Sequence, residues 1–172
     1  MTTKPSSSNY PQYFERYISQ VTEGDLQDGF SKQTPAAEAF LETITEEFSN
    51  RKYAEDKWTI KEVLQHVIDA ERVFSYRAMC IARKEQQTLP SFDEKNYADH
   101  VNANDRSWKD LTEEFSALRK ATLCLYKSFP DEVFNNVGNV NDYTISVAAL
   151  GFITVGHVTH HLKIIRERYI GV

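Results

Sequence analysis

The stretch Ser146–Tyr169, SVAALGFITVGHVTHHLKIIRERY, is the most informative about the fold. Its apolar residues recur at helical spacing, which predicts a terminal helix roughly 36 Å long at about 1.5 Å per residue. The chain has only 6 glycines and 5 prolines in 172 residues, so such long helices are possible elsewhere too. One face of this helix should pack into the core. It carries Val147, Leu150, Thr154, His157, His161, Ile164 and Ile165.

Two earlier segments show the same periodicity. The first helix is predicted to start after Thr34, with Pro35 in the first helical position, where a proline is tolerated. Its apolar positions extend over 37–48. The second is predicted to start at Thr59, because Thr59 and Glu62 form the capping-box pattern in which each side chain binds the other's exposed amide.

A further long helix is predicted over 108–129, ended by Pro130. A short amphipathic helix is predicted over 10–21, stopping near Gly24. Four long amphipathic helices with little strand signal predict an all-α protein, a four-helix bundle with a short extra N-terminal helix.

The remaining segments are predicted to be irregular. Residues 1–9 are expected to form a flexible tail, followed by a single domain over 10–172. The segment 86–104 has turn signals and no sustained period, which is typical of a functional or covering loop. Residues 135–143 are predicted to be a loop, with no stretch long enough for a sheet.

Composition excludes several classes of function. The chain has 25 acidic residues against 20 Lys and Arg, a net charge of −5, and no basic run, so nucleic acid is not expected as a partner. No stretch reaches the ~18–20 apolar residues of a membrane span, and residues 1–11 lack the apolar core of a signal peptide. We therefore expect a cytoplasmic protein. Cys80 and Cys124 are expected to be buried free thiols.

The placement of the five histidines is the most informative feature. His157 and His161 are four residues apart, so both point toward the core side of the last helix. His66 lies in the apolar stripe of the helix that starts at Thr59. His160 is about 60° around the helix from His157 and is interpreted as a boundary residue. His100 falls in the long loop and is expected to be solvated.

Three imidazoles on two core faces would each need a buried hydrogen-bond partner, and one divalent cation satisfies all three. Core histidines that are merely hydrogen-bonded are the alternative. Three neutral ligands leave open coordination positions, as in catalytic sites, where a bound water or thiol becomes acidic. Zn²⁺ and Ni²⁺ both suit imidazole.

Two of these segments resemble a known family. KWTIKEVLQHVIDAER (57–72) is similar to the second bundle helix of the DinB-like, or YfiT-like, proteins, and GHVTHHLKII (156–165) is similar to their last helix with its HxxHH signature. LPSFDE (89–94) and RERY (166–169) also look familiar, and the resemblance extends from about residue 10 to the end.

The resemblance implies a bundle of up-down-down-up topology that is often a homodimer. It also implies Zn²⁺ or Ni²⁺ on three histidines, carried here by His66, His157 and His161. Characterised relatives transfer low-molecular-weight thiols, and others are described as metal-dependent hydrolases. The expected function is therefore a metal-dependent transferase or hydrolase acting on a small molecule. The alternatives are a non-catalytic metal-binding bundle, acting as sensor or dimeric interaction module, and a plain bundle without metal.

Other polar residues are candidates for supporting roles. Arg77 falls near His66 on the helical wheel, where a buried cation would need an internal carboxylate or an anionic substrate group, so it is a candidate for substrate positioning. Asp69 could orient an imidazole or be solvated. Asp93 and Tyr97, in the loop, could reach the mouth of the bundle.

Overall fold

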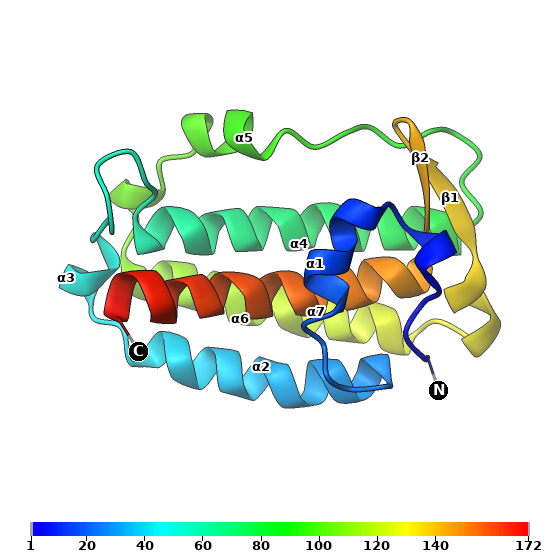
Figure 1. Cartoon of the computed structure of the whole chain (residues 1–172), viewed down its shortest axis with the longest axis horizontal. Helices are drawn as coiled ribbons and strands as arrows, with labels where there is room; N and C mark the ends of the chain where they lie inside the picture. Colours follow the sequence, from blue (N-terminus) through cyan, green and yellow to red (C-terminus); the bar gives the residue numbers. More distant parts are fainter. Residues whose placement is uncertain (1, 172) are drawn as a thin grey trace.

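The computed structural model describes residues 2–171 and confirms the predicted four-helix bundle (Figure 1). The long helices lie side by side, and α2 and α7 run in one direction while α4 and α6 run in the other, which is the up-down-down-up order (Figure 1). A π-helical turn, Ile165–Ile170, extends the last helix. The four helices are α2 (Leu26–Glu42), α4 (Ile60–Ala82), α6 (Trp108–Lys127) and α7 (Val147–Ile164).

The direction of α6 explains the long connection that precedes it. Because α4 and α6 are parallel, the chain must return along the whole length of α4 before α6 begins (Figure 1). The returning segment carries the short helix α5 (Glu94–His100) and a 3-10 turn at Ala103–Asp105. It is therefore only partly irregular, unlike the loop predicted over 86–104.

The predicted capping box fixes the start of α4. The Thr59 hydroxyl accepts a hydrogen bond from the Glu62 amide at 3.1 Å, and the Glu62 carboxylate accepts one from the Thr59 amide at 2.6 Å. The last helix starts in a similar way, because the Ser146 hydroxyl accepts a hydrogen bond from the Ala149 amide. Both α4 and α7 thus begin where the local sequence predicts a helix start.

The predicted start of α2 was wrong. The helix begins at Leu26, and Pro35 lies inside it rather than at its first position. The Asp25 carboxylate caps it by accepting a hydrogen bond from the Gln27 amide at 2.9 Å. Leu26 and Phe30 are fully buried. Their packing outweighs the cost of Pro35, which has no backbone N–H to donate a helical hydrogen bond. The helix ends at Glu42, earlier than the apolar positions over 37–48 predict. The last of those positions lies in a separate short helix, α3 (Glu46–Ser49).

The N-terminal segment folds against the bundle in short pieces. Instead of one helix over 10–21, it has 3-10 turns at Ser7–Asn9 and Gln12–Phe14, followed by α1 (Glu15–Ile18), which packs on α7. In the predicted tail, Thr2 donates a hydrogen bond from its amide to the Asp25 carboxylate at 2.7 Å. Met1 lies outside the described residues.

A hairpin replaces the loop predicted over 135–143. Strands β1 (Val137–Val140) and β2 (Tyr143–Ser146) pair antiparallel, and Val137 faces Ser146. The two-residue turn places Asn141 at φ 48°, a left-handed conformation that asparagine tolerates. Burial of Val140 and Ile145 against the bundle stabilises strands that would be too short alone. The prediction that this region forms no sheet was therefore wrong.

The core consists of two hydrophobic clusters. On α7 one cluster extends to Val155 and the other begins at Val158, so His157 lies between them. Both cysteines are free as expected, but they are not buried as predicted: Cys80 is half-buried at the edge of the core, and Cys124 is exposed. Within residues 2–171 no helix is both long and apolar enough to cross a bilayer.

Candidate metal centre

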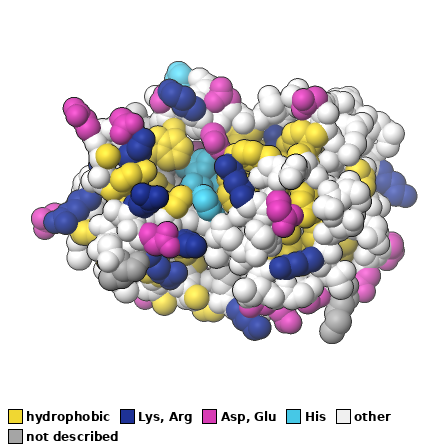
Figure 2. Space-filling model, in the orientation of Figure 1, with side chains coloured by type: hydrophobic (Ala, Val, Ile, Leu, Met, Phe, Trp, Pro, Cys, Tyr) yellow, Lys and Arg dark blue, Asp and Glu magenta, His cyan; other side chains and the backbone are white. Residues whose placement is uncertain are grey.

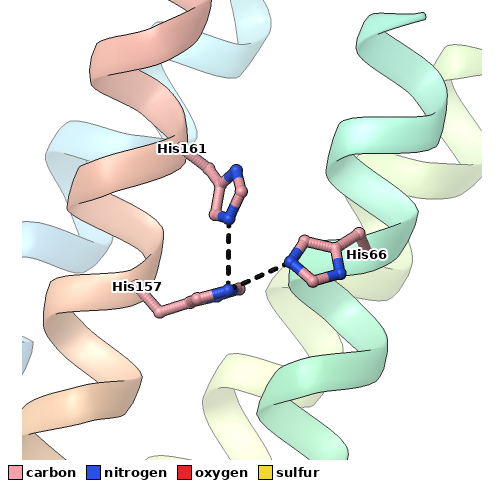
Figure 3. A group of neighbouring side chains, drawn as sticks. All are labelled: His66, His157 and His161. Atoms are coloured by element: carbon pink, nitrogen blue, oxygen red, sulfur yellow. Dashed lines mark hydrogen bonds between the residues drawn. The ribbon is translucent and has the colours of Figure 1, made fainter. Parts of the chain in front are cut away.

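Three imidazoles from two helices converge in the bundle (Figure 3). His66 projects from α4, and His157 and His161 project from α7, one turn apart. The Nε2 atom of His157 lies 3.1 Å from Nε2 of His66 and 3.2 Å from Nε2 of His161. The three candidate ligand atoms all lie within 4.8 Å of one another. The structure thus brings together the three histidines singled out in the sequence.

This arrangement fits a divalent transition ion. Two nitrogens each ~2.0–2.1 Å from a tetrahedral ion are roughly 3.3–3.4 Å apart, close to the two separations between the Nε2 atoms. Burial lowers the pKa of His66 to about 4. Burial, and then the neighbouring histidines, hold the pKa values of His157 and His161 well below their usual range. All three imidazoles are therefore neutral near pH 7, which is the form that binds metal.

Aromatic side chains surround the imidazoles and restrict their orientation. The Tyr17 ring meets His157 edge-on at a centroid distance of 5.0 Å, and Phe74 does so at 5.7 Å. Trp58 packs against His66 at 5.2 Å. Tyr17 reaches the site because α1 crosses α7, a contact that the helical period of α1 could not reveal. These rings give the centre an apolar surround, which explains the lowered pKa values.

The other candidates lie outside the cluster. Nδ1 of His160 lies 3.1 Å from the Gln20 side-chain amide, at the boundary of the core as predicted. His100 is exposed on α5, as predicted. The Asp69 carboxylate accepts a hydrogen bond from the Gln65 side chain at 3.0 Å, so it belongs to a polar group beside the site rather than to an imidazole.

A cavity of about 710 Å³ adjoins His157. Figure 2 shows histidine side chains reaching the surface near the middle of one face, between hydrophobic and charged groups. The cavity's wall is built from the N-terminal segment, α4, the hairpin and α7. Its main side chains are Phe14, Tyr17, Phe74, Arg77, Tyr143 and His157.

Arg77 and Asp93 line this cavity, whereas Tyr97 does not. Arg77 is only 4% exposed, and its Nη2 donates a hydrogen bond to the Pro90 carbonyl at 2.8 Å. Asp93 caps α5 by accepting a hydrogen bond from the Asn96 amide. Tyr143 was missed in the sequence, since the hairpin that carries it was not predicted.

Comparisons with known proteins agree with this architecture. The sequence profile of the DinB superfamily matches residues 29–165. The chain therefore belongs to the DinB superfamily. YfiT from Bacillus subtilis, described as a probable metal-dependent hydrolase with an unusual four-helix bundle topology, has a similar fold. The TM-score is 0.71 at 19% identity, over 95% of this chain and 90% of that one. No curated protein matches the chain.

Proposed function

We propose that this protein is a metal-dependent enzyme acting on a small molecule, with His66, His157 and His161 binding one Zn²⁺ or Ni²⁺ ion. The convergence of three neutral Nε2 atoms beside a large cavity carries this proposal. A divalent ion held there would lower the pKa of a thiol or of water, which supports thiol transfer to an electrophile or its hydrolysis.

The residues of the chain have separable roles in this scheme. The imidazoles contribute no charge, so the centre favours an anionic exogenous ligand such as a thiolate. His157 is one of the three clustered histidines, His66, His157 and His161, which we call the histidine triad, and it also lines the cavity, so a molecule in the cavity has access to the centre. Tyr17 and Phe74 exclude water from one side of His157 and hold its ring in place.

Metal content tests the binding step. Protein purified without chelators should contain close to one transition ion per chain by elemental analysis. His66→Ala and His157→Ala should each reduce this content at least about tenfold, since two ligands bind much more weakly than three. His100→Ala is the matched control, because His100 is exposed and outside the cluster. Metal-free wild-type protein would overturn the proposal.

Turnover tests the catalytic step. Low-molecular-weight thiols and model electrophiles or esters should react faster with the wild-type protein than with His161→Ala. A rate lost on chelation and restored by Zn²⁺ or Ni²⁺ would support an enzyme. Metal binding without any metal-dependent rate would instead identify a binding module, a sensor or dimeric interaction domain.

A further inference from the structure

The bundle buries two arginines in different ways. Arg119 is fully buried, and its Nη2 donates a hydrogen bond to the Glu71 carboxylate at 2.8 Å, so its charge is neutralised within the protein. Arg77 is 4% exposed, yet among residues 2–171 no carboxylate forms an ion pair with it. A buried cation without an anion is unfavourable, so we expect an anionic ligand from outside the chain to neutralise the charge of Arg77.

The guanidinium of Arg77 is placed to meet such a ligand. A guanidinium has five N–H donors, and the Pro90 carbonyl accepts from Nη2. Arg77 lines the cavity that also reaches His157. Tyr143, at the first position of β2, lines it too, and its ring lies near enough that the Arg77 charge opposes the rise in Tyr143 pKa caused by burial. A guanidinium and a phenol both offer donors that a carboxylate can accept, and the guanidinium can bind a carboxylate through two parallel hydrogen bonds.

We propose that Arg77, assisted by Tyr143, binds a carboxylate group of the substrate. The identification of the ligand as substrate rests on the proposed function, but the anion site itself does not. Arg77 is eleven residues along α4 from His66, so the two Cα atoms are about 16 Å apart along the helix axis. The substrate therefore holds its carboxylate several bonds away from the atom that reacts at the histidines.

The rest of the cavity restricts the ligand further. Phe14, Phe74 and half-buried Tyr143 supply an apolar wall between Arg77 and His157. Three exposed acidic side chains lie along the same cavity, and they repel additional negative charge at low salt. These are Asp93, Glu94 and Asp142. The structure therefore favours a monocarboxylate with an apolar body over a polyanion.

Ligand titration tests this proposal. The probes are 4-phenylbutanoate and its uncharged primary amide, titrated by calorimetry or NMR into the protein as purified and again after chelator treatment. The carboxylate should bind at least about tenfold more tightly than the amide, because charge-assisted hydrogen bonds to a desolvated guanidinium are strong. Equal binding of acid and amide would overturn the proposal.

Substitutions test whether the preference for the carboxylate over the amide depends on Arg77 and Tyr143. Arg77→Gln should abolish it, Arg77→Lys should keep part of it, and Tyr143→Phe should reduce it several-fold. Arg83→Gln is the matched control, since exposed Arg83 ends the same helix. Thermal unfolding of each variant shows whether it is folded. If Arg77→Gln does not fold, Arg77→Lys and Tyr143→Phe still test the proposal.

The two proposals fail in distinguishable ways. A carboxylate preference that survives Arg77→Gln but disappears on chelation would place the anion at the metal and overturn the Arg77 site. A preference that depends on Arg77 in protein that contains no transition metal as purified, before any chelator is added, would support the anion site while overturning the metal-dependent function.

Discussion

At the scale of single residues, the site depends on keeping three imidazoles uncharged. His66 is 6% exposed and His157 is 3% exposed, and the rings nearest to them are Tyr17, Trp58 and other histidines. The groups outside these three histidines whose charge acts on His157 are His160 and then Arg16, and both lower its pKa. Burial and neighbouring charge thus both favour the metal-binding form.

Stability of the chelator-treated protein should fall on acidification. The pKa of His66 is lowered from 6.5 to about 4 in the folded protein, so only the unfolded chain takes up this proton between those values. The free energy of unfolding should therefore decrease as the pH falls from 6.5 to 4, by up to about 3 kcal/mol from His66 alone. Denaturant unfolding at several pH values measures this slope.

His66→Gln isolates the contribution of this histidine. The variant should lose part of the acid sensitivity between pH 6.5 and 4, whereas the same substitution at exposed His100 serves as the control. An unchanged slope in His66→Gln would show that this imidazole is not desolvated as its surroundings require.

At the scale of elements, the crossing of α1 over α7 builds one side of the site. Gly156 lies directly before His157, and a Cβ placed on it would come 2.0 Å from the Tyr17 carbonyl oxygen. The absence of a side chain at this position lets the backbone of α1 approach α7 closely. That approach brings the Tyr17 ring against His157.

Gly156→Ala should destabilise the protein by about 1–3 kcal/mol, because the clash is with backbone that cannot rotate away. Gly24→Ala is the control, since a Cβ there would meet nothing within 4 Å. Its stability should stay within about 0.5 kcal/mol of wild type. Chemical denaturation of both variants checks the difference, and equal stabilities would argue against the close crossing.

At the scale of the whole molecule, one buried polar network links all four long helices. Arg119 on α6 binds Glu71 on α4 and donates to the Gln33 side chain on α2 at 3.0 Å. Gln33 in turn donates to the Thr159 hydroxyl on α7 at 2.9 Å. The network is imperfectly satisfied, because Oε1 of Glu71 and Nε of Arg119 have no hydrogen-bond partner among the described residues.

Removing one member of the pair should be more harmful than removing both. Glu71→Leu leaves Arg119 buried without its counter-ion, at a cost of about 3–5 kcal/mol. The double variant Glu71→Leu/Arg119→Met should recover most of that loss. Lys95→Met, in the exposed Lys95–Asp99 pair, should change stability by less than about 1 kcal/mol. Unfolding free energies that simply add would contradict this coupling.

The fold class and the position of each of the three histidines on the core-facing side of its helix could be predicted, because both depend on local sequence. The Thr59 capping box and the spacing of His157 and His161 depend on residues within one or two helical turns. Helical periodicity also placed His66 on a core face. Each of these patterns can be recognised in the sequence before the packing partner of the helix is known.

The helix partners and the cavity were decided only by the tertiary structure. Asp25 could be recognised as the start of α2 only once Leu26 and Phe30 were known to be buried, and the hairpin forms because the bundle covers Val140 and Ile145. Periodicity identifies the buried side of a helix but says nothing of which distant segment covers it. The contact of His66 with His157, and the placing of Arg77 and Tyr143 on one cavity wall, are long-range packing outcomes that no local pattern contains.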